Sequence, residues 1–197
     1  PDPVSTTQPP RWRSAFVVIF IITLSGLVEL SLQAADYGLI GTTRWRGLAY
    51  QCGAFWAGLL YDWQPNYAAQ PWVMFLSYVL LHGGFGHLTG NMISLWVLGE
   101  IAAKHINQKE LLTIYVTSAI GGGLCFGLLS SSLQPMVGAS GALFGLVGAW
   151  QYWRWLARRN TGRSLWPIWY AMFWLIVLNA LLWAMLGGLL AWETHLG

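Results

Sequence analysis

Charged side chains are scarce in this sequence, and their scarcity excludes the largest class of proteins. Only 9% of the 197 residues are charged and 56% are hydrophobic, whereas a soluble domain has about 25% charged residues. Too few polar side chains are present to cover a globule in water. Lipid is therefore the expected solvent, and the length suits one compact membrane domain.

Cysteine is scarce too. Cys52 and Cys125 are the two in the chain, too few for a disulfide framework.

The basic residues, which give a net charge of +3, are scattered between apolar runs, and this does not favour nucleic-acid binding. The first apolar run is long and lacks a cleavage-type ending, so no removable signal peptide is predicted. Because the chain starts at Pro1, we expect some natural sequence to precede it.

Hydrophobic runs, in contrast, are abundant. A membrane-spanning helix needs about 20 mostly apolar residues. Runs of this kind cover residues 14–32, 85–103, 111–130, 140–156 and 165–186, and a sixth begins near Leu189. Residues 33–71 are rich in Trp, Tyr and Gly, a composition typical of the membrane interface. The predicted fold is an all-α membrane protein with six transmembrane helices and an interface-lying first loop. The sixth run is cut short, and we expect the natural chain to continue beyond Gly197.

The Lys and Arg residues predict how the helices are oriented. If every run crosses the membrane, Arg44 and Arg46 fall on one side and the other eight basic residues on the opposite side. Those eight are Arg11, Arg13, Lys104, Lys109, Arg154, Arg158, Arg159 and Arg163. Loops rich in Lys and Arg stay in the cytoplasm. Residues 1–13 are therefore predicted to be a cytoplasmic N-terminal segment, and the expected membrane is a bacterial inner membrane.

Several polar side chains fall at the outer ends of the predicted helices. They are His82, His87 and Asn91 around the start of the second run, Ser140 at the start of the fourth and His195 in the sixth. Residues far apart in the sequence thus come to a similar depth near the outer face. This is the layout of a site built between helices.

Ser140 begins a predicted helix. The first N–H groups of a helix have no partner within it, and the helix dipole favours negative charge there. An oxyanion formed at this serine would therefore be stabilised. The segment is not the nucleophile elbow of soluble hydrolases, because Ala142 stands where that motif requires Gly. The alternative is a serine that only bonds to a neighbouring helix or turn.

A serine becomes nucleophilic when a base takes its proton, and neutral imidazole is the usual base. His195 is the candidate, although a histidine near a membrane interface is often only a hydrogen-bonded residue. Phe144 lies four residues after Ser140, hence on the same helix face, where it can stack on the His195 ring. Glu193 would face elsewhere on a helix. We therefore expect a Ser–His dyad.

His87 and Asn91 are four residues apart and share a helix face. A ring N–H and amide donors can both point at a developing oxyanion.

Histidines on the outer side of the membrane also suggest a metal site. A metalloprotease needs His-Glu-x-x-His, however, and no acid lies between His82 and His87. We expect neither a metal nor a cofactor.

Together these residues resemble the rhomboid family of intramembrane serine proteases over residues 72–197. The resemblance rests on three motifs: His82, His87 and Asn91 with the family's spacing; Gly138-Ala139-Ser140-Gly141 followed by Ala-Leu-Phe-Gly; and His195-Leu196-Gly197 as the start of an Ala-His-x-x-Gly signature. Two departures stand out. Trp72 is followed by Val73 where the family has Trp-Arg, and Thr194 replaces the Ala before the histidine.

The resemblance implies a six-helix rhomboid-like protease domain over residues 14–197. It implies that Ser140 is the nucleophile and His195 the general base. It also implies an oxyanion hole formed by His87, Asn91 and the Ser140 backbone N–H, with His82 supporting the cavity mouth. The expected partners are the lipid bilayer and transmembrane protein substrates, which would enter beside a mobile helix at residues 165–186.

Two other functional classes stay open. A non-catalytic rhomboid-like protein would bind and escort membrane clients, but such relatives typically lack the serine or the histidine. A transporter or channel would carry broken helices and paired charges at mid-membrane, whereas Glu29 and Glu100 lie near the ends of apolar runs.

Overall fold

The computed structural model describes residues 15–185, 187 and 190–197. The predicted cytoplasmic segment 1–13 and Leu189, where the sixth run begins, lie outside the described residues. The α-helices are α1 (Phe16–Asp36), α2 (Trp45–Gly53), α3 (Gln70–Ser77), α4 (Phe85–Ala102), α5 (Gln108–Leu129), α6 (Ser140–Asn160) and α7 (Trp166–Met185). Short 3-10 helices are η2 (Ala57–Leu60), η3 (Tyr78–Leu80) and η4 (Trp192–His195).

The long helices follow the predicted apolar runs. α1, α4, α5, α6 and α7 cover the five complete runs to within a few residues, apart from longer C-terminal ends on α1 and α6. Three of them, α1, α5 and α7, are long and apolar enough to cross a membrane. The chain is thus an all-α membrane bundle, while the count of six spans stays a prediction. The last described segment is not the α-helix expected there. It is the short 3-10 helix η4, with i→i+3 hydrogen bonds from the Thr194 N–H to the Ala191 carbonyl and from the Leu196 N–H to the Glu193 carbonyl.

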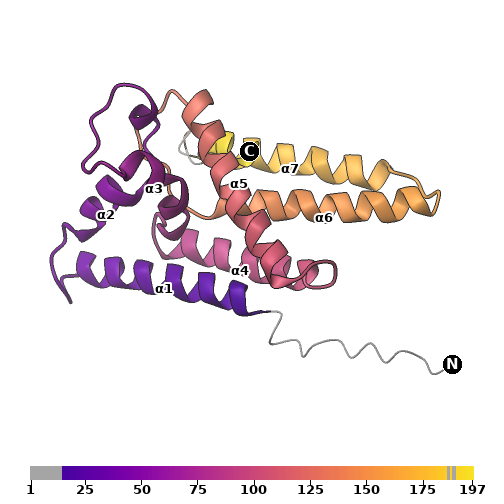
Figure 1. The fold of residues 1–197 in the computed structure, drawn as a ribbon, viewed down its shortest axis with the longest axis horizontal. Helices are drawn as coiled ribbons and strands as arrows, with labels where there is room; N and C mark the ends of the chain where they lie inside the picture. The colour runs from indigo at the N-terminus through magenta and orange to yellow at the C-terminus, as the bar shows by residue number, and fades with distance from the viewer. Residues whose placement is uncertain (1–14, 186, 188–189) are drawn as a thin grey trace.

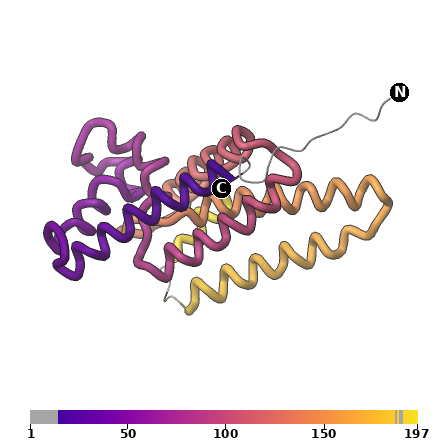
Figure 2. The backbone as a smooth tube through the Cα atoms, turned by 90° about the horizontal axis from the view of Figure 1, so that it is seen from below, coloured from indigo at the N-terminus to yellow at the C-terminus, as the bar shows by residue number. Residues whose placement is uncertain are grey.

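The helices form a packed body from which one hairpin projects. In Figure 1, α1 and α4 run side by side and α5 crosses the bundle, while α6 and α7 form a hairpin that extends beyond the other elements. Figure 2 shows the same hairpin from a second direction. The core lies where α4, α5 and α6 meet the first loop, around Phe55, Tyr78 and Leu95, which are fully buried.

Glycines let α5 and α6 approach their neighbours closely. A Cβ at Gly123 would lie 2.8 Å from the Phe55 ring. A Cβ at Gly145 would collide with the Ser118 side chain, so the small-residue spacing along α6 serves helix packing. The start of α5 is set by a capping box, in which the Asn107 side chain accepts from the Lys109 and Glu110 N–H groups.

An ion cluster ties the first loop to the rest of the bundle. Arg46 of α2 donates to both carboxylate oxygens of the fully buried Glu29 of α1, at 2.9 and 3.0 Å, and to Asp36 at 2.6 Å. These hydrogen bonds, above all those to Glu29, raise the pKa of Arg46. Arg46 also donates to the His82 carbonyl at 3.2 Å, and the Tyr50 hydroxyl donates to the same oxygen at 2.6 Å. The cluster therefore holds the loop that leads into α4.

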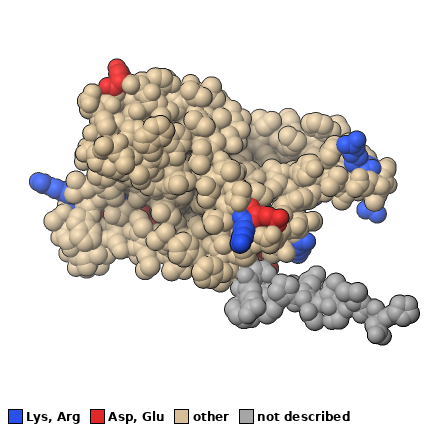
Figure 3. All heavy atoms as spheres, in the orientation of Figure 1, with Lys and Arg blue, Asp and Glu red and all other residues tan. Residues whose placement is uncertain are grey.

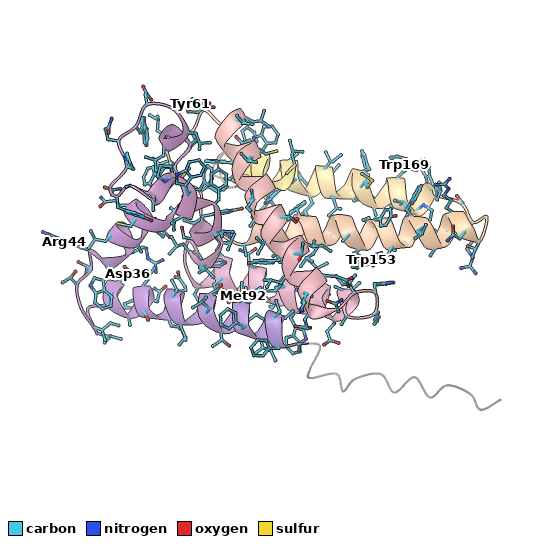
Figure 4. The ribbon with its side chains drawn as sticks, in the orientation of Figure 1. Asp36, Arg44, Tyr61, Met92, Trp153 and Trp169 are labelled. Carbon is cyan, nitrogen blue, oxygen red and sulfur yellow. The ribbon has the colours of Figure 1, made fainter. Side chains whose placement is uncertain are left out.

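Charges are absent from most of the visible surface, where they occur in a few separate places. Figure 3 shows a largely uncharged face with basic groups at the tip of the α6–α7 hairpin, where Arg158 and Arg159 occupy the last turn of α6. Asp36 and Arg44 lie at the opposite end (Figure 4). A surface with so few charges suits a body embedded in a bilayer.

Candidate active site

The segment before α6 is anchored on both sides and delivers Ser140 at the first helical position. Phe55 and Met136 exchange two backbone hydrogen bonds, at 3.0 and 2.9 Å. Gly138 then donates to the Tyr78 carbonyl at 3.0 Å, with a φ of +118° that only glycine adopts without strain. Ser140 follows two residues later, with its backbone N–H at the amino end of a 21-residue helix.

The His195 ring lies against Ser140. Its Nε2 is 2.9 Å from the Ser140 Oγ, and its face stacks on Phe144 with ring centroids 4.1 Å apart and planes inclined by 8°. The preceding residue, Thr194, is buried between two helices. A Cβ at Gly122 of α5 would lie 2.6 Å from the Thr194 Oγ1, and one at Gly141 of α6 would be as close. These two glycines make room for the segment that carries His195.

A residue that the sequence did not single out completes the histidine's contacts. The Nδ1 of His195 is 2.9 Å from the Oδ1 of Asn179, in α7. Because an amide oxygen only accepts, Nδ1 carries the proton in this arrangement and Nε2 presents its lone pair to the serine. The sequence offered one sign that this residue could be functional. Asn179 is a single amide side chain within the otherwise apolar sequence of α7, and polar side chains in such runs are often functional.

Two further donors converge beside Gly138. The His87 Nδ1 accepts from the Gly83 N–H at 3.2 Å, so in the neutral ring the proton is on Nε2. A Cβ at Gly138 would lie 2.8 Å from that Nε2 and 3.5 Å from the Asn91 Nδ2. The Asn91 Nδ2 is buried and has no hydrogen-bond partner among the described residues. A buried donor without a partner is unusual and suits a group that binds something else.

His82 lies behind this pair, in the loop before α4. His82 is fully buried, and its ring lies edge-on to the His87 ring, with ring centroids 5.3 Å apart. Burial, with a smaller contribution from His87, lowers the pKa of His82 to about 4, so the ring is neutral at neutral pH. Within the described ranges, no group of three or more His, Cys, Asp and Glu side chains is arranged to hold a metal ion.

The structure therefore brings the predicted site residues into two adjoining groups. Ser140, His195 and Phe144 form one group, and His87 and Asn91 meet Gly138 in the other. A hydroxyl beside an imidazole lone pair, with N–H donors nearby, is an arrangement capable of nucleophilic acyl transfer.

Comparisons with known proteins agree with this arrangement. The sequence model of the Rhomboid domain matches residues 69–197, more than half of the chain. RHOMBOID-like protein 5 of Arabidopsis thaliana is 45% identical over 75 residues, covering 38% of this chain and 24% of that protein. Rhomboid protease GluP of Bacillus subtilis is 35% identical over 81 residues, covering 41% of this chain and 16% of that protein.

A longer match of lower identity is to the putative rhomboid protease YdcA of Bacillus subtilis, 24% identical over 136 residues, or 69% of this chain and 61% of that protein. The matched segments thus span less than two thirds of the length of each of these relatives. The domain match includes every residue of the candidate site from His82 to His195. The resemblance predicted from the motifs is confirmed: this chain is a member of the rhomboid family.

Proposed function

We propose that this protein is an intramembrane serine endopeptidase that cleaves transmembrane segments near the outer face of the membrane. The observation that carries the proposal is the 2.9 Å contact between the His195 Nε2 and the Ser140 Oγ. A serine that only bridges two helices needs no imidazole lone pair. Membership of a family that includes named rhomboid proteases supports the same activity.

The proposed reaction begins with Ser140. Its Oγ attacks the scissile carbonyl carbon while His195 Nε2 accepts the hydroxyl proton. The tetrahedral oxyanion is stabilised by the His87 Nε2–H, the Asn91 amide and the Ser140 backbone N–H. The C–N bond then breaks, and His195 gives the proton to the departing amine. In the second half, His195 takes a proton from water, whose oxygen attacks the acyl-enzyme carbonyl. The bond between the acyl carbon and the Ser140 Oγ then breaks, His195 returns the proton to Oγ, and the carboxylate product leaves.

The proposed substrate is a membrane helix that can be locally unwound. Backbone carbonyls inside a helix are hydrogen-bonded and shielded, so a segment with helix-weakening residues near its outer end would be favoured. The distribution of Lys and Arg supports a cytoplasmic N-terminus. In that orientation Ser140 lies toward the outer end of α6, away from the basic turn at Arg158 and Arg159.

The test is Ser140→Ala with Ser94→Ala as its matched control. Ser94 is also a helical serine, but its hydroxyl donates to the Gly90 carbonyl one turn earlier. Ser140→Ala should abolish both cleavage of a model transmembrane substrate and labelling by a fluorophosphonate, and Ser94→Ala should preserve both. Unchanged cleavage in Ser140→Ala would overturn the proposal. Capture of a substrate by wild-type protein without cleavage would instead indicate a binding or escort factor.

A further inference from the structure

Among the long helices, α7 is the one least held by the rest of the protein. Of its 20 residues only Ile168 is buried, and large side chains such as Trp169, Phe173 and Ile176 are more than half exposed. Trp169 lies on the arm of the hairpin that extends away from the body (Figure 4). Most of the surface of α7 therefore faces lipid, and few protein contacts fix its position.

This loosely held helix nevertheless contributes a polar contact to the reacting pair. Asn179, half-buried in α7, is 2.9 Å from the His195 Nδ1 through its Oδ1. An amide among apolar side chains in lipid is costly unless it is hydrogen-bonded. The contact thus favours one placement of α7, with Asn179 turned toward η4.

The contact with Asn179 determines which nitrogen of the His195 ring faces Ser140. Stacking on Phe144 fixes the plane of the His195 ring, but the plane is the same after a 180° flip about the Cβ–Cγ bond, which exchanges ring nitrogen and carbon positions. No carboxylate among the described residues hydrogen-bonds the ring, and the partner of its Nδ1 is the Asn179 Oδ1. By accepting from Nδ1, the Asn179 oxygen favours the flip state in which Nε2 faces Ser140, and it keeps the proton on Nδ1.

We propose that Asn179 is a positioning residue that couples the base to the seating of α7, so that His195 is competent only while α7 lies against η4. This inference rests on the proposed protease function and deepens it. When α7 moves away, the acceptor is lost and the proton can occupy Nε2, where it faces Ser140 as a donor. The serine then has no base, although every atom of the Ser–His pair is still present.

The contact should act on the transition state more than on substrate binding. His195 becomes positively charged when it takes the serine proton, and a hydrogen bond from a charged donor is roughly twice as strong as a neutral one. An interaction that strengthens on the way to the transition state raises kcat and leaves KM largely unchanged.

The test compares Asn179→Leu and Asn179→Asp with Leu178→Ala, a change at the neighbouring exposed position of α7. Leucine keeps the approximate size but removes the acceptor. Asn179→Leu should lower both kcat and the rate of fluorophosphonate labelling of Ser140 by about 10- to 100-fold, with KM changed by less than about threefold. The small probe reports on the nucleophile without requiring a membrane helix to enter.

The pH profile separates positioning from a merely structural role. The carboxylate in Asn179→Asp restores an acceptor and holds the ring proton more tightly, so His195 stays protonated, and inactive as a base, up to a higher pH. Activity in Asn179→Asp should therefore recover toward wild type, with its acid limb displaced to higher pH. Loss of activity in Asn179→Asp equal to that in Asn179→Leu, or identical profiles for Asn179→Asp and wild type, would overturn the proposal.

A double-mutant cycle tests the coupling to α7. Ile168→Ala removes the buried anchor of α7, 11 positions before Asn179, and should slow labelling in wild type but not further in Asn179→Leu. Independent losses that add would refute the coupling. Thermal unfolding of each variant in detergent identifies misfolded protein, and Asn179→Asp then supplies the folded comparison. If Ser140→Ala abolishes labelling while Asn179→Leu behaves like Leu178→Ala, the protease proposal stands and only the coupling fails.

Discussion

Replacing Gly138 by alanine adds one methyl group at the point where the two halves of the candidate site meet. The added Cβ would lie 2.7 Å from the His87 Cε1 and 2.8 Å from its Nε2, with the Asn91 Nδ2 at 3.5 Å. Carbon atoms do not approach ring atoms this closely, so the His87 ring must turn away or the loop must move. The backbone φ of +118° adds strain for any residue with a side chain.

The two effects have separable magnitudes. Holding alanine in a backbone conformation that favours glycine costs about 1–3 kcal/mol of folding stability. Displacing the His87 N–H from the oxyanion removes about 2.7–4 kcal/mol of transition-state stabilisation, which lowers kcat by roughly 10²- to 10³-fold. KM should change little, because the donor acts on charge that develops only in the transition state.

The assay is steady-state cleavage of a membrane substrate in parallel with thermal unfolding in detergent. Gly148→Ala is the matched control, since Gly148 lies in the same helix as Ser140 and an added Cβ there meets no atom within 4 Å. That control should keep wild-type kcat and gain up to about 1 kcal/mol of stability. If Gly138→Ala kept kcat within threefold of Gly148→Ala, the placement of His87 as an oxyanion donor would be refuted.

Three further substitutions test other parts of the site. Arg46→Ala leaves the fully buried Glu29 carboxylate without its cation and should cost about 3 kcal/mol of unfolding free energy. The control Arg44→Ala, at an exposed neighbouring position, should stay within about 0.5 kcal/mol of wild type. Equal effects of the two substitutions would contradict a structural role for the ion cluster. Asn91→Ala should lower kcat by roughly 10²- to 10³-fold without loss of stability, because its Nδ2 has no partner among the described residues to lose. Phe144→Leu removes the stacked ring 4.1 Å from His195 and should slow fluorophosphonate labelling by about tenfold, whereas an unchanged rate would show that stacking does not orient the base.

The long helices were predictable because their signal is local. A run of apolar residues ended by charges or glycines predicts a helix in lipid whatever it packs against. Site convergence was predictable as well, because alternating crossings bring the starts of the second and fourth runs to one side. His87, Asn91 and Ser140 lie at such starts. The spacing of the motifs predicted the remaining site residues.

Side-chain contacts between different elements were not predictable in this way. Asn179 lies in a run of otherwise apolar residues, with no spacing to His195 that marks the two as neighbours. Arg46 was counted as a loop charge, yet its guanidinium reaches Glu29 in α1 and the His82 carbonyl. Both contacts depend on rotations of helices about their own axes, which a hydropathy pattern without a clear apolar face does not determine.

The sparse packing of α7 makes the bilayer a determinant of this helix's position. Its 20 residues form a helix about 30 Å long, close to the thickness of the hydrocarbon layer of a typical membrane. With one buried anchor at Ile168, its tilt responds to hydrophobic mismatch more readily than that of a helix held on all sides. A thinner or thicker membrane would then move Asn179 relative to His195, so reconstitution in lipids of graded acyl-chain length would alter turnover without any change in the protein.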